Sequence, residues 1–97
     1  MEFDGKDAYY ELINGHIVRK ASPNPYHQAI SIRLSSVMHR HVTEHKLGMV
    51  FTAPTDVFLD DFNHGIPDLL FVRQDNLGVV GYKEGILGVP DLVVEII

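Results

Sequence analysis

The chain has 97 residues, of which 45% are hydrophobic and 22% charged, and its formal net charge is −5 with the six histidines neutral. This composition excludes a disordered or low-complexity chain, and the length allows one small domain. The chain has no cysteine, which excludes disulfides and thiolate metal sites, and its negative charge counts against a sequence-independent nucleic-acid binder.

The first expected element is a β-hairpin. Residues 9–13 and 16–20 predict two strands, and Asn14-Gly15 lies between them. This pair favours a type I′ turn, because both central residues of that turn need a positive φ. Residues 21–25 contain two prolines and predict a loop, since proline has no backbone donor.

A long helix is expected next, over residues 26–46. Asn24 fits its N-cap, and Pro25 fits its first position. Gly48 is expected to end the helix as a glycine C-cap. The 3.6-residue spacing predicts one buried stripe, made of Ile30, Leu34, Val37 and His41, with His27 and His45 at its edge.

The second half of the chain predicts short strands over 49–53, 55–59, 66–72 and 91–97, with a turn at 60–65. Glycine-rich residues 74–89 predict one helical turn plus loops. The strands 66–72 and 91–97 are nearly all apolar, which indicates burial on both faces, whereas one helix covers only one face. We therefore expect an α/β (α+β) fold. We also expect residues 1–97 to be the N-terminal part of a larger domain, or to be completed by a partner chain.

The sequence indicates a cytoplasmic protein with no membrane partner. No apolar run approaches the ~20 residues that span a bilayer. The N-terminal residues 1–4 are acidic where a signal peptide would be basic. The lack of cysteine fits a reducing cytosol.

Three acids are expected inside apolar strands: Glu11, Asp68 and Glu95. Burying an ionised carboxylate costs several kcal/mol unless it is paired or binds a metal. The bases nearest to these segments are Arg19, Lys20 and Arg73. Asp68 and Glu95 lie on consecutive predicted strands, where they can converge, and with a backbone carbonyl they suit Mg²⁺ or Mn²⁺. The alternative is that each acid lies at an edge, is hydrogen-bonded or is neutral through a raised pKa.

Several histidines gather toward the end of the predicted helix. His41 and His45 are four residues apart, as in helical zinc pairs, and His39 lies nearby. The chain has neither cysteine nor a His-Glu-x-x-His pattern, so the sequence favours surface histidines, and a histidine-based metal carrier is the lesser alternative. Asp56, in the strand 55–59, is expected to face outward.

Four segments resemble, in order, the motifs of a known family: YELINGHIV (10–18), SPNPYH (22–27), PDLLFV (67–72) and PDLVVEI (90–96). The chain resembles the Uma-two family of restriction-endonuclease-like proteins, a branch of the PD-(D/E)XK nuclease superfamily. The resemblance covers nearly all of the chain. It implies a mixed sheet flanked by helices, of which residues 1–97 would form the N-terminal half.

The resemblance implies a Mg²⁺-dependent endonuclease that hydrolyses phosphodiester bonds in DNA. Asp68 and Glu95 would be its motif acids, and together with the Ile96 carbonyl they would hold Mg²⁺ or Mn²⁺. Glu11 would be an added catalytic acid near the site. His27 would be an auxiliary residue at the start of the helix.

The superfamily carries a lysine two residues after its second acid, and here that position is Ile97. The resemblance implies that this lysine lies on a following helix, which the 97 residues do not include. Two hypotheses therefore stand. The chain is a metal-dependent endonuclease, or it is a non-catalytic remnant that acts as an interaction module and covers its bare sheet by forming a homodimer.

Overall fold

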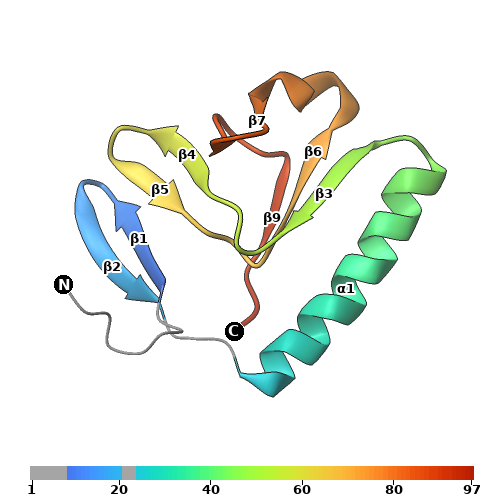
Figure 1. The fold of residues 1–97 in the computed structure, drawn as a ribbon, viewed down its shortest axis with the longest axis horizontal. Helices are drawn as coiled ribbons and strands as arrows, with labels where there is room; N and C mark the ends of the chain where they lie inside the picture. Colours follow the sequence, from blue (N-terminus) through green and yellow to red (C-terminus); the bar gives the residue numbers. More distant parts are fainter. Residues whose placement is uncertain (1–8, 21–23) are drawn as a thin grey trace.

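The computed structural model describes residues 9–20 and 24–97 and has the expected mixed α+β class. Within these residues one α-helix, α1 (Pro25–Glu44), lies alongside two sheets (Figure 1). The larger sheet has the strand order β2-β1-β5-β4-β8-β7, with β1 (Tyr9–Ile13), β2 (His16–Lys20), β4 (Val57–Asp60), β5 (Asn63–Gly65), β7 (Val80–Gly81) and β8 (Gly85–Ile86). The smaller sheet has the order β3-β6-β9, with β3 (Gly48–Thr52), β6 (Leu69–Arg73) and β9 (Leu92–Val94).

The predicted hairpin is confirmed. β1 and β2 pair antiparallel, and the turn residues Asn14 and Gly15 have φ values of 50° and 79°. The turn is tied to the neighbouring hairpin, because the Gly15 N–H donates to the Phe62 carbonyl oxygen at 3.0 Å. The segment 60–65, predicted as a turn, also contains β5, which joins β1 to β4.

The helix begins where the sequence predicts. Asn24 is the N-cap, and its Oδ1 accepts the His27 N–H at 2.9 Å, with Pro25 in the first turn. The end was predicted wrongly. The helix ends at Glu44 with His45 as its C-cap, and Lys46 takes the left-handed conformation, with a φ of 53°. Gly48 instead opens β3, where a Cβ would collide with the Val72 carbonyl oxygen across the sheet.

The predicted buried stripe of the helix is wrong. Ile30 and Val37 are exposed, whereas Ser35 and Val42 are buried. The face that packs toward β3 therefore lies about a quarter-turn from the predicted one. Ser35 suits close packing because it is small and its hydroxyl donates to the Ile32 carbonyl oxygen at 3.0 Å.

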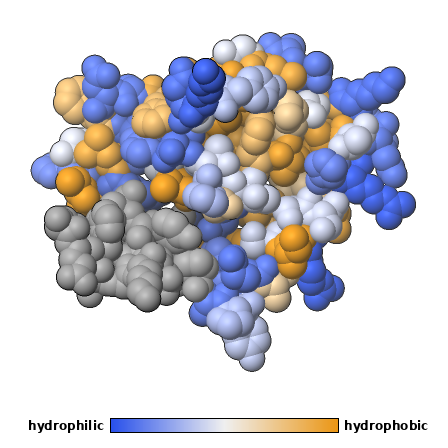
Figure 2. Space-filling model, in the orientation of Figure 1, coloured by the Kyte–Doolittle hydropathy of each residue, from blue (hydrophilic) through white to orange (hydrophobic). Residues whose placement is uncertain are grey.

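The core lies around β6, between the two sheets. Leu69 and Leu70 are fully buried, and neighbouring strand residues point to opposite faces, so both faces of β6 are covered as predicted. Leu70 packs in one cluster with Val57 of β4 and Ile86 of β8, which joins the two sheets. Figure 2 shows hydrophobic residues gathered over the middle of the face drawn, with hydrophilic residues around it.

The last predicted strand, 91–97, is wrong in length. Only Leu92–Val94 form β9, and Leu92 and Val93 are exposed. Residues 74–89 contain a 3₁₀ helix, η1 (Gln74–Val79), in place of the predicted helical turn, and they also add β7 and β8. None of the described helices is long and apolar enough to cross a membrane.

Candidate functional site

Asp68 stands at the junction of β6 and β9. The β6–β9 ladder runs from Phe71↔Leu92 to Leu69↔Val94, so the next position in this register would set Asp68 opposite Glu95. Each acid therefore lies one residue beyond a strand, and the prediction that both lie inside strands is wrong. The cause is the Asp68 carboxylate, whose Oδ2 accepts the Ile96 N–H at 2.6 Å and ends the backbone ladder.

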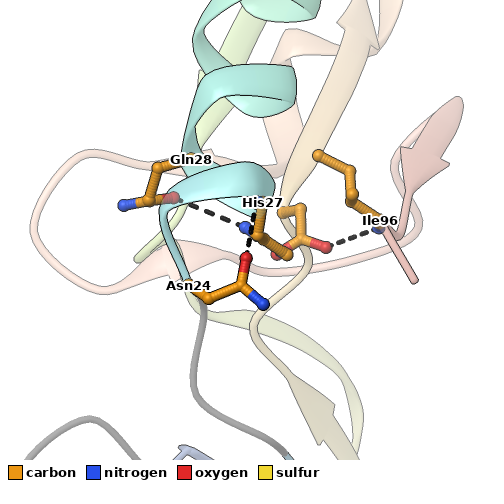
Figure 3. Close-up of polar contacts among 5 residues, drawn as sticks. Asn24, His27, Gln28 and Ile96 are labelled. Carbon is orange, nitrogen blue, oxygen red and sulfur yellow. Dashed lines mark hydrogen bonds and ion pairs between the residues drawn. The ribbon is translucent and has the colours of Figure 1, made fainter.

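His27 holds the other oxygen of Asp68. Its Nε2 lies 3.0 Å from Asp68 Oδ1, and the exposed fractions of the two side chains are 19% and 7%. In Figure 3, Asn24, His27 and Gln28 lie in the first turn of α1, and Ile96 faces them from the C-terminal segment. The Asn24 cap fixes the start of the helix and so fixes where His27 emerges. The carboxylate is thus held from two sides by two distant parts of the chain.

A groove opens beside this pair. Its volume is about 550 Å³, and it is lined by the first three turns of α1, by residues 52–54 and by Ile66, together with His27 and Asp68. The described residues that line it include no lysine or arginine. A pocket of this size accepts a small molecule or a fragment of a polymer, and Asp68 is its buried acid.

Glu11 lies close to the site but does not contact Asp68 in any hydrogen bond described. Its Oε2 accepts the Ile66 N–H over a long 3.4 Å, two residues before Asp68. Glu11 therefore stabilises the segment between β5 and β6, in which Ile66 lines the groove. Glu95 is exposed and stands at the register position opposite Asp68.

The three predicted metal ligands, Asp68, Glu95 and Ile96, lie near the end of the β6–β9 pair. Across residues 9–20 and 24–97, no group of three or more His, Asp or Glu side chains is close enough to hold a metal ion. Mg²⁺ commonly uses only one or two carboxylates together with water, and each carboxylate oxygen has a second lone pair. Asp68, Glu95 and the Ile96 backbone fit that hard-oxygen set in their chemistry. The contact that Ile96 makes with Asp68 is through its amide, not its carbonyl.

The partner of Asp68 was missed from the sequence. Arg19, Lys20 and Arg73 were the expected bases, but Arg73 pairs with Asp75 at 2.9 Å, and the other two side chains lie outside the described part of the chain. The partner found is a histidine. The signal that could have found it is the Asn24 cap, which places His27 in the first turn of the helix.

Two acids outside the groove, Asp60 and Asp91, have a lowered pKa. Hydrogen bonds from the Phe62 backbone and the Asn63 side chain lower the pKa of Asp60. A hydrogen bond from the Arg73 backbone, then one from the Asn76 side chain, lowers the pKa of Asp91. Asp91 precedes β9, so these bonds tie the start of β9 to the end of β6 and to the 3₁₀ helix η1.

Comparison with known proteins identifies a family for this chain. No curated protein matches the chain. The model of the family Uma2, described as "Putative restriction endonuclease", matches residues 1–97, which is the whole chain. The match includes the groove and both motif acids. The chain therefore belongs to the Uma2 family.

Proposed function

We propose that the chain is a Mg²⁺-dependent endonuclease that hydrolyses phosphodiester bonds in DNA, in the cytoplasm. Membership of a family described as restriction endonucleases supports the nuclease chemistry. The observation that carries the proposal is Asp68, a carboxylate only 5% exposed that is fixed at both oxygens on the wall of a groove.

The energetic argument favours a functional role for Asp68. A buried carboxylate is costly, and replacing a whole buried ion pair by well-packed apolar residues is often neutral or stabilising, although removing one partner alone is destabilising. Asp68 is nevertheless held by the His27 ring and the Ile96 amide, which restrict it to one orientation. Restricting a ligand in this way preorganises a site, because less freedom is lost when the ligand is used.

The metal would be Mg²⁺ or Mn²⁺, held by Asp68, Glu95 and the Ile96 carbonyl. A bound divalent cation supplies polarisation of the phosphate and a water of lowered pKa. The chain's own residues orient the site. His27 holds Asp68 from the helix, and Glu11 holds the groove wall through the Ile66 amide.

The net charge of −5 does not exclude DNA as the substrate. The site carboxylates contribute to this charge, and a divalent cation offsets them locally, where the phosphate would bind. DNA binding should therefore depend on the metal, because the described lining of the groove offers no lysine or arginine to the phosphate.

Calorimetric titration with Mg²⁺ and Mn²⁺, followed by plasmid cleavage, tests the proposal. Asp68→Asn and Glu95→Gln should each weaken metal binding at least tenfold and abolish cleavage. Asp56→Asn is the matched control, because Asp56 also contacts a histidine but lies outside the groove. Metal binding and cleavage that survive in the Asp68→Asn/Glu95→Gln double variant would overturn the proposal.

A second candidate is a non-catalytic interaction module that forms a homodimer. Exposed apolar side chains on α1 favour it, namely Ile30, Ile32 and Val37, together with Ile97 at the position of the motif lysine. Sedimentation velocity at micromolar concentration tests it. A dimer that Ile32→Lys dissociates would support this candidate, and a monomer at all concentrations would contradict it.

A further inference from the structure

Two histidines near the C-terminal end of α1 lie against each other. His41 and His45 are one helical turn apart, and their ring centroids are separated by 4.4 Å with a tilt of 37°. Both are exposed. Side chains four residues apart on a helix are neighbours, so α1 itself places both imidazoles on one exposed face.

A hydrogen bond fixes the orientation of one ring. The Nδ1 of His45 lies 2.9 Å from the His41 carbonyl oxygen, so Nδ1 carries the proton and donates it. The same carbonyl oxygen also accepts the His45 backbone N–H at 3.1 Å, so it holds both the backbone and the ring of His45. The Nε2 of His45 is then left with its lone pair. Metal-binding histidines characteristically donate their other ring N–H to a carbonyl or carboxylate in this way.

We propose that His41 and His45 form a binding site for a divalent transition metal, Zn²⁺, Cu²⁺ or Ni²⁺. Imidazole suits these metals, whereas Mg²⁺ prefers oxygen ligands. Zinc–nitrogen bonds of about 2.0–2.1 Å require two ring nitrogens within roughly 3–3.5 Å, which rings with centroids 4.4 Å apart can reach. The negative end of the helix dipole also favours a cation here.

The residues around His41 and His45 leave room for a metal ion and its water ligands. Among the residues that the structure describes, no third metal-binding side chain joins the two histidines, so water completes the coordination. Arg40, which precedes His41, is paired with Glu44 at 3.2 Å, which reduces its repulsion of a metal, and Lys46 is the neighbouring cation after His45. His27 lies 14 positions before His41, about 21 Å along the helix, so this site is separate from the groove.

Calorimetric titration of the whole chain with ZnCl₂ and CuCl₂ tests the proposal. One metal should bind per chain. His41→Gln and His45→Gln should each weaken zinc binding at least tenfold, whereas His39→Gln, an exposed histidine on another side of the helix, should leave it unchanged. Zinc should also raise the melting temperature of the wild type and of His39→Gln, but not of the double variant.

Further controls separate this site from the groove and from misfolding. Asp68→Asn should keep its zinc binding, so failure of the proposed nuclease would leave this proposal intact. Helical circular dichroism should be unchanged in the three histidine variants. Zinc affinity that is equal in the wild type and in the His41→Gln/His45→Gln variant would overturn the proposal, as would a wild type that takes up no zinc.

Discussion

Two histidine–aspartate pairs in this molecule have the same contact distance and different surroundings. His27 Nε2 lies 3.0 Å from Asp68 Oδ1, and His64 Nε2 lies 3.0 Å from Asp56 Oδ1. The side chains of the first pair are 19% and 7% exposed. Those of the second are 30% and 45% exposed. Contact distance alone therefore does not distinguish a buried pair from a more exposed one.

The two pairs also differ in how far apart along the chain their contacting residues lie. His64 and Asp56 are eight residues apart, and the His64 ring stacks on Phe58, at 4.4 Å and 11°, within the same hairpin. His27 and Asp68 come from a helix and a strand junction, and Asp68 is also bound by the Ile96 amide. The His64–Asp56 pair stabilises one hairpin, whereas the His27–Asp68 pair joins α1, β6 and the segment after β9.

The largest expected difference follows from removing each aspartate. Asp68→Ala would leave the Ile96 amide and the His27 ring without their acceptor, and should lower the free energy of unfolding by about 2–3 kcal/mol. Asp56→Ala removes a partly exposed pair and should cost less than about 1 kcal/mol. Urea unfolding measures both. Equal losses of unfolding free energy in the two variants would show that burial does not make the two pairs differ in their contribution to stability.

Removing each histidine tests positioning. In His27→Ala the Asp68 carboxylate loses the contact that orients its Oδ1, and Mg²⁺ affinity should fall about tenfold, as for other residues that orient a metal ligand. His64→Ala should not change this affinity, because His64 lies outside the groove. Calorimetry gives both values. An unchanged affinity in His27→Ala would contradict a positioning role.

The coupling within each pair should differ by a smaller amount. A double-mutant cycle on His27 and Asp68 should give about 1.5 kcal/mol, whereas the cycle on His64 and Asp56 should give about 0.5 kcal/mol. At about 1 M salt the second coupling should fall further than the first, because screening acts most on exposed charges. Equal salt sensitivity of the two couplings would contradict the assigned difference in solvent access.

Local signals in the sequence predicted local structure well. Asn14-Gly15 specified its turn, and Asn24-Pro25 specified the helix start, because a turn and a cap depend on a few neighbouring residues. The buried face of α1 could not be found in this way. It depends on the surface of β3, where the small Ser35 packs better than the larger Ile30 of the predicted stripe.

Of the candidate site, the sequence predicted the buried acid but not the side chain that pairs with it. The cost of burying a carboxylate singled out Asp68, and the structure does bury it. Its partner was missed: the Asn24 cap places His27 in the first turn of α1, but the side from which His27 reaches Asp68 depends on the rotation of the helix. The short β9 has a similar cause, since a side chain, Asp68, binds the Ile96 amide that a longer backbone ladder would use.

A third carboxylate, that of Asp91, extends the comparison of Asp68 with Asp56, and its expected effect is the smallest. Asp91 has two hydrogen-bond partners, as Asp68 does, but it is exposed, whereas Asp68 is buried. Its pKa lies below the ordinary value of 3.8, because the Arg73 amide and the Asn76 side chain donate to the charged form. The unfolded chain therefore binds a proton at a higher pH than the folded chain does. The contribution of Asp91 to stability is present above pH 3.8 and is lost as the pH falls through its folded pKa.

Asp91→Asn should remove this part of the acid dependence. The variant should be slightly less stable than the wild type at pH 7, and the difference should shrink as the pH falls below 3.8. Urea midpoints measured from pH 3 to pH 7 give the two profiles, and Asp75→Asn is the control, since Asp75 meets only the exposed Arg73 side chain. A constant difference across this range would mean that the partners of Asp91 do not favour its charged form. Having two partners would then stabilise a carboxylate only where, as at Asp68, the surrounding protein also excludes water.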